Sequence, residues 1–253
     1  MLSFSNTNTS GSSATVGIGG LYVNGSNPYG MCIWSPTARS LVTGGATNLS
    51  VDDADRTSTK CFMRGLKENV RIQTSTPLPW LWRRIVFTTK CNAFQVNITA
   101  DANPAQTYRP YSDTSVGMAR LWFNLQQNNQ PATVNFYNGI IFRGTVNQDW
   151  VDTMTAKVDT SRITVLSDKT QTIRTGNSNG HFSERKLWYG FNKTLVYDDD
   201  EAGSQEVTSY FSTEAKPGMG DVYVVDYFQP GVGSGSGDII SVNATSTLYW
   251  HEK

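Results

Sequence analysis

Apolar and polar residues alternate in short runs along most of the chain, a pattern typical of half-buried β-strands. Between Ile240 and Trp250, even-numbered positions are mostly apolar and odd-numbered ones are Ser, Asn, Thr or Tyr. Similar runs predict strands near 31–34, 60–74, 83–90, 94–99, 118–125, 133–146, 162–166, 186–197, 207–212, 221–228 and 239–250. A short helix is predicted over 148–157. About eight main strands with long loops predict an all-β fold, a two-sheet antiparallel sandwich or jelly roll.

The domain organisation is expected to be simple. The first 20 residues are rich in Ser, Thr and Gly, which predicts an extended lead-in over 1–20. The remaining residues, 21–253, contain no obvious linker and no repeat, and they fit one large all-β domain.

Segment 61–90 holds two strand-like runs joined by a proline-rich turn. In the first run one face is expected to carry Phe62, Leu66, Val70 and Ile72, and the other Met63, Lys67 and Arg71. In the second run Ile85 and Phe87 alternate with Arg84, Val86 and Lys90. A sheet face with cations and aromatic rings suits phosphates and unpaired bases. The nucleic-acid-binding candidates are Arg64, Lys67, Arg71, Trp80, Trp82, Arg83, Arg84 and Lys90. The alternatives are solvated cations, Trp in the core or at an interface, and an ion pair for Arg83.

Charge is distributed unevenly although the formal net charge is zero. Residues 1–100 carry nine basic and four acidic side chains, 101–190 nine and seven, and 191–253 three and ten. This gradient suits a protein that packs against copies of itself, unless folding interleaves the halves.

The acidic run Asp198, Asp199, Asp200 and Glu201 begins like a calcium loop, but Ala202 and Ser209 occupy positions where an EF-hand needs ligands. We expect either a solvated turn or a subunit interface that meets Lys or Arg of a neighbouring copy. No metal site or cofactor is predicted.

Several function classes find no support in the sequence. No run approaches the roughly 20 apolar residues of a membrane span, and no signal-peptide pattern begins the chain. Cys32, Cys61 and Cys91 are widely spaced, which predicts buried free thiols. The chain has two His and lacks nucleophile-elbow, zinc-protease and Walker motifs, so an enzyme is not expected.

Four blocks together resemble the coat proteins of genomoviruses, small circular single-stranded DNA viruses related to geminiviruses. They are residues 61–90, NKTLVYDDDEAG (192–203), GMGDVYVVDYF (218–228) and STLYWHEK (246–253). The opening MLSFSNTNTSG also resembles the start of that family's shell domain. Because the blocks occur in the family's order and span nearly the whole chain, the resemblance is specific.

The resemblance implies a jelly-roll subunit that self-assembles, roughly sixty copies to a T=1 icosahedral shell, around circular single-stranded DNA. It also implies location in the virion and, during assembly, in the host nucleus. Family members usually begin with an arginine-rich arm, whereas the first basic residue here is Arg39. We therefore expect either a shortened form or DNA contacts from the shell's inner face. The alternative is a carbohydrate-binding, lectin-like jelly roll.

Overall fold

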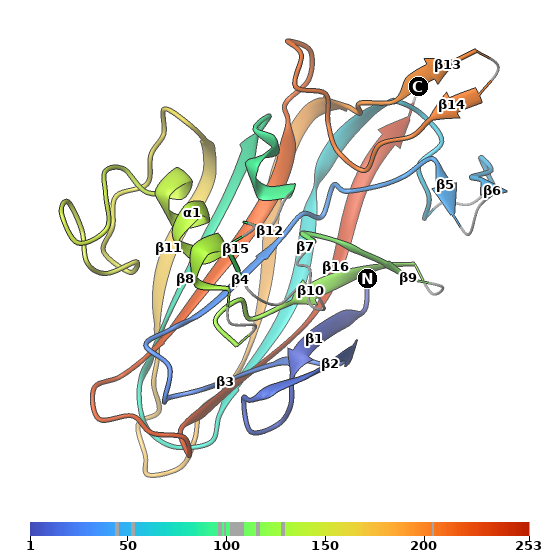
Figure 1. Ribbon diagram of the computed structural model, residues 1–253. Helices are drawn as coiled ribbons and strands as arrows, with labels where there is room; N and C mark the ends of the chain where they lie inside the picture. The colour runs from blue at the N-terminus through green and yellow to red at the C-terminus, as the bar shows by residue number, and fades with distance from the viewer. Residues whose placement is uncertain are drawn as a thin grey trace.

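Eight strands form the two main sheets of the computed structural model, which describes residues 1–43, 46–51, 54–95, 98, 100–101, 109–114, 117–127, 130–203 and 205–252 (Figure 1). In chain order the strands are β3 (Leu21–Asn24), β4 (Gly30–Trp34), β7 (Lys60–Thr74), β8 (Trp80–Thr89), β11 (Thr164–Ile173), β12 (Phe182–Val196), β15 (Asp221–Pro230) and β16 (Ile239–Glu252). One sheet has the order β12-β7-β16-β3 and is called the open sheet below. The other has the order β11-β8-β15-β4 and is called the covered sheet.

The pairing of these eight strands is that of a jelly roll. The first strand pairs with the last, the second with the seventh, the third with the sixth and the fourth with the fifth, all antiparallel. Two further antiparallel pairs, β15 with β8 and β16 with β7, join these hairpin layers into sheets. The chain is thus one long hairpin wound into two sheets, which confirms the predicted all-β jelly-roll sandwich.

Strands β8, β15 and β4 of the covered sheet are buried on both faces, whereas its edge strand β11 is largely exposed. Alternate residues such as Trp82, Val86 and Phe228 pack between the two sheets. Residues on the opposite face, such as Ile85 and Phe87, pack under helix α1 (Pro131–Ile141) and the short 3-10 helix η1 (Asn92–Gln95). Figure 1 shows α1 beside β8 and β11, on the side away from β7 and β16. A sheet covered on both faces reads as a nearly continuous apolar run, as β8 and β15 do.

Three sequence predictions of elements between residues 94 and 157 were wrong. The strand predicted over 133–146 is mostly α1, because Val134, Tyr137, Asn138 and Ile141 lie on one helical face and Pro131 favours a helix start. The helix predicted over 148–157 forms turns. The strand predicted over 94–99 overlaps η1 and partly lies outside the described residues.

The N-terminal residues belong to the fold. Residues 1–20, predicted as an extended lead-in, contain strands β1 (Ser3–Thr7) and β2 (Ser13–Ile18), and β1 is mostly buried. It pairs in parallel with β10 (Gly117–Trp122), which also pairs with β9 (Ser112–Thr114). The Ser3 hydroxyl contacts the backbone of Ala244 in β16. This third sheet therefore packs against the edge of the sandwich.

Two small hairpins complete the described strands. They are β5 (Val42–Thr43) with β6 (Ala46–Thr47), and β13 (Asp200–Ala202) with β14 (Gln205–Val207). The strand predicted over 207–212 is represented only at its first residue, where β14 ends.

Candidate nucleic-acid interface

The outward face of the open sheet is the part of the molecule that matches the predicted cationic surface. From Leu66 to Thr74, even-numbered residues of β7 are buried and odd-numbered residues are exposed. In β12, the even-numbered residues from Phe182 to Gly190 are exposed. A strand with one buried and one exposed face is expected where a sheet has a core on one side and solvent on the other.

Strand register brings cations from different strands into neighbouring rows on this face. The rows across β12, β7 and β16 are Glu184–Arg71–Asn243, Lys186–Asn69–Thr245 and Trp188–Lys67–Thr247. Successive rows lie two residues apart, which is ~6.8 Å along a strand. Each row therefore contributes one cation, Arg71, Lys186 or Lys67.

Lys67, Arg71 and Lys186 form no ion pair and no side-chain hydrogen bond with any residue that the structure describes. Exposed cations that lack an acidic partner keep their charge available for phosphates. Arg64, at the β-bulge that ends this part of the face, is also exposed and donates a hydrogen bond to the Asn192 side chain.

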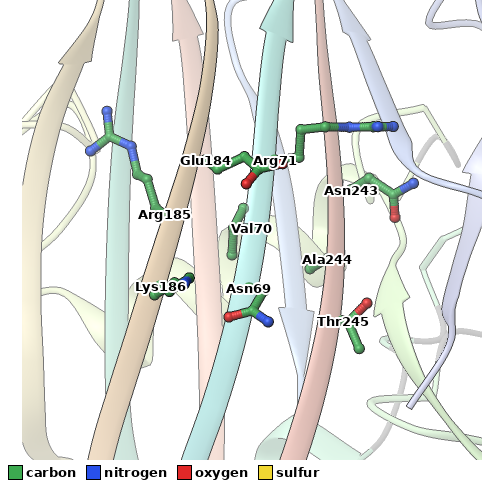
Figure 2. Close-up of a pocket in the computed structure, with 9 residues that line it drawn as sticks. All are labelled: Asn69, Val70, Arg71, Glu184, Arg185, Lys186, Asn243, Ala244 and Thr245. Carbon is green, nitrogen blue, oxygen red and sulfur yellow. The ribbon is translucent and has the colours of Figure 1, made fainter.

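A hollow of about 370 Å³ lies on this face around Arg71 and Lys186. Figure 2 shows the Arg71 side chain extending across β16 on the side of Asn243, with its guanidinium pointing away from the Glu184 carboxylate. The amides of Asn69 and Asn243 add neutral donors and acceptors. The Glu184 carboxylate also lines the hollow, but the cations there outnumber it, and the net positive charge beside polar groups suits a phosphate backbone.

Two aromatic rings lie at the Lys67 end of the same face, Trp188 in the row of Lys67 and Tyr249 in the row that follows. Trp188 is 54% exposed and Tyr249 is 43% exposed, and their ring centroids lie 5.8 Å apart. Tyr249 is paired with Gly65 of β7, which has no side chain to separate the rings. Sequence reasoning missed Lys186, Trp188 and Tyr249, although the alternation of polar and apolar residues over 182–190 and 239–250 was the signal that could have found them.

The predicted binding residues Trp80 and Trp82 are wrong for this surface, because each is 1% exposed. Trp82 stacks on Phe228 between the sheets, and its indole N–H donates to Asp226 at 2.8 Å. A base has no access to either ring in the folded chain. The alternative that Trp residues here belong to the core is the correct one.

Arg83 is also buried and lies on the side of the covered sheet that faces α1. Its guanidinium forms an ion pair with Asp168 at 2.7 Å and donates to the carbonyls of Thr153 and Ala156. These bonds tie the loop after α1 to the sheet, so Arg83 is removed from the binding candidates.

Arg84 belongs to an ion network between the two sheets. It pairs with Glu68 at 2.5 Å and with Asp226 at 2.6 Å, and Arg120 pairs with the same two carboxylates at 3.0 and 2.8 Å. Burial alone would raise the pKa of Glu68 and Asp226, but the two guanidinium groups outweigh it and lower both pKa values. Two positive and two negative side chains thus balance, and burial of Arg84 keeps its guanidinium out of reach of DNA.

The remaining candidates divide clearly. Arg64, Lys67 and Arg71 are exposed on the open sheet, as predicted. Lys90 is half-buried, and its ammonium donates to the backbone carbonyls of Ala215 and Pro217.

The orientation of Met63 was predicted wrongly. A β-bulge at Arg64 shifts the pairing of β7 with both neighbours, so Met63 faces the core and not the outward side with Lys67.

The acidic run is split by the fold. The Asp199 side chain is 2% exposed and accepts hydrogen bonds from Arg56 at 2.5 and 2.9 Å. Burial alone would raise the pKa of Asp199, but the bonds from Arg56 and Ser209 outweigh it and lower the pKa. Asp199 is therefore removed from the predicted subunit interface, whereas Asp198, Asp200 and Glu201 are exposed.

Other chemistry is sparse in the part of the chain that the structure describes. There is no group of three or more His, Cys, Asp or Glu side chains arranged for a metal ion, and no helix long and apolar enough to cross a membrane. Cys32 and Cys61 are buried free thiols as predicted, while Cys91 is exposed. No family model and no curated protein matches this chain.

Proposed function

We propose that this protein is a viral coat subunit, of the kind that genomoviruses build, and that its copies close into a T=1 shell around circular single-stranded DNA. The observation that carries the proposal is the exposed face of the open sheet, where Arg71, Lys186 and Lys67 are unpaired in successive rows of a jelly roll. The four sequence blocks that resemble genomovirus coat proteins add independent support.

Packaging in this proposal needs no chemical reaction. Cations of the open sheet neutralise phosphates and release counterions, largely without regard to base sequence. Asp198, just before β13, and Asp200 and Glu201, within β13, supply acidic groups for a contact with basic residues of a neighbouring subunit. Closed symmetry then satisfies every such contact in the shell.

Carbohydrate binding is the second candidate. A hollow of about 420 Å³ near the end of β16 contains Tyr249 and Trp250 together with Asp55 and Glu252. Aromatic rings beside carboxylates can bind the apolar faces and the hydroxyls of a sugar. This candidate predicts saturable glycan binding by a chain that stays monomeric or forms small oligomers.

Electron microscopy of the purified chain, with ultraviolet absorbance of the particles, tests the proposal. We expect uniform closed particles whose absorbance ratio shows nucleic acid. A triple variant, Lys67→Gln, Arg71→Gln and Lys186→Gln, should package less nucleic acid. The matched control is Lys157→Gln, Lys169→Gln and Arg174→Gln, which removes three exposed cations outside the open sheet. Persistent monomers or small oligomers would overturn the coat assignment.

A further inference from the structure

The exposed aromatic rings of the open sheet suggest a role that charge alone does not supply. Resting on the proposed function, we infer that Trp188 and Tyr249 form a base-stacking site that makes this face selective for single-stranded nucleic acid. Unpaired bases can reach such a site, whereas the bases of a duplex are stacked inside the double helix. Duplex DNA would retain only the electrostatic part of the binding.

Gly65 shapes this site. A methyl group at Gly65 would lie 2.7 Å from Cζ2 of the Trp188 indole, so the ring lies over the bare backbone of β7. Covering a strand glycine with an aromatic ring stabilises a sheet, and this accounts for the inner face of the indole. It does not account for the outer face, because 54% of Trp188 stays exposed beside a partner ring inclined at 55°.

Trp188 is also the most exposed of the seven tryptophans. Trp34, Trp80, Trp82 and Trp122 are at most 1% exposed, and Trp150 and Trp250 are half-buried. An exposed indole on a protein surface has a hydration cost that burial elsewhere would avoid. Trp188 lies among surface cations and not in the core with the four buried tryptophans. This position is the one expected of a ring that contacts a ligand.

The cations lie where a single strand of DNA stacked on these rings would place its phosphates. Lys67 is the direct neighbour of Trp188 across β7 and β12, while Lys186 and Arg71 occupy the next two rows, each ~6.8 Å further along. A single strand that runs along β7 would therefore contact one cation per row and insert a base at the Trp188–Tyr249 end. Stacking on an aromatic side chain does not select one base over another, which suits the enclosure of a whole genome.

The test separates bases from phosphates. Two probes are used with the unassembled chain: an oligothymidylate of about ten nucleotides and an abasic strand with the same phosphates. We expect the wild-type protein to bind oligothymidylate about tenfold more tightly than the abasic strand, and Trp188→Leu or Tyr249→Leu to abolish that preference. Binding of the abasic strand should be unchanged, because the cations remain.

Two variants control for folding and for hydrophobicity. Trp188→Phe keeps a ring and should retain most of the preference for oligothymidylate over the abasic strand. Any variant that replaces Trp188 should also lack the part of the indole fluorescence that oligothymidylate quenches in the wild type. Phe182→Leu changes a 61% exposed aromatic residue on the same strand, ~20 Å away, and should bind like the wild type. Thermal melting confirms that each variant is folded.

The outcomes distinguish the site from the proposed function. Equal binding of both strands by the wild type, or an undiminished preference in Trp188→Leu, overturns the stacking site while packaging by charge stands. If the wild type fails to bind even the abasic strand, the proposed binding of phosphates by the cations of the open sheet is wrong. Duplex DNA with the same number of phosphates as the abasic strand should bind no more tightly than that strand. A duplex affinity that falls in Trp188→Leu contradicts the inference.

Discussion

Asp221 should give this fold an unusual dependence on pH. Its carboxylate is 1% exposed at the start of β15 and accepts hydrogen bonds from the Ser212 amide and hydroxyl at 2.9 and 3.0 Å. Burial raises its pKa from 3.8 to about 7, and the bonds from Ser212 only partly oppose this effect. Asp221 thus differs from Glu68 and Asp226, whose pKa values the arginines lower.

The sign of the effect follows from proton binding. Between pH 4 and about 7 the folded protein keeps a proton on Asp221 that the unfolded chain has lost. Stability from this group is therefore greatest at low pH and is lost as the pH rises through the folded value. One pKa unit corresponds to ~1.36 kcal/mol, and the folded pKa lies about two units above pH 5, so the loss between pH 5 and 8 amounts to ~2.7 kcal/mol.

The assay is urea denaturation of the unassembled chain at pH 5, 6, 7 and 8. Asp221→Asn keeps the size of the side chain and an acceptor for the Ser212 amide, but it cannot ionise. We expect its free energy of unfolding, relative to the wild type, to rise by ~2.7 kcal/mol between pH 5 and 8. Asp199→Asn is the control, because the pKa of that carboxylate is lowered below 3.8 and the group is ionised in both the folded and the unfolded chain from pH 5 upward, so its difference from the wild type should be nearly the same at every pH. A difference between Asp221→Asn and the wild type that is the same at every pH would refute the reasoning.

Three further predictions concern the core and the open sheet. Asp226→Asn leaves Arg84 and Arg120 with one carboxylate between them and should lower the free energy of unfolding by ~3–5 kcal/mol in urea titrations, whereas the exposed control Asp198→Asn should change it little. Trp82→Ala should cost ~3–5 kcal/mol of stability. The folded Trp82→Ala protein should bind oligonucleotides as tightly as the wild type. If a fully folded variant bound them more weakly, Trp82 would have to be part of the binding surface. Lys67→Gln should reduce the slope of log K against log salt for single strands by ~0.7, while Lys90→Gln, whose ammonium already binds two carbonyls, should leave the slope unchanged.

The alternation of apolar and polar residues was sufficient to predict the long strands. β7 and β16 lie where their period-two patterns predicted them, and β4 and β15 nearly so. Local signals failed where a segment was short or where its spacing fitted a helix as well as a strand. The run in α1 combines β-branched and aromatic residues with helical spacing, and the tertiary contact of its buried face with the covered sheet favoured the helix.

Sequence alone did not reveal which cations are free. Lys67 and Arg71 follow the alternation of a strand with one solvent face, and they are exposed as that pattern implies. Arg83 and Arg84 follow a similar pattern in β8, yet both are buried, because α1 covers one face of that sheet and the open sheet covers the other.

The sequence by itself determined the fold class, the main strands and the presence of exposed cations on one face of β7. Only the tertiary structure decided which side chains form that surface. Arg84 finds its partners Glu68 and Asp226 on two other strands, while Trp188 and Tyr249 come together across β7 over Gly65. The physical reason is that alternation along one strand specifies two faces, whereas burial of each face depends on layers that distant parts of the chain supply.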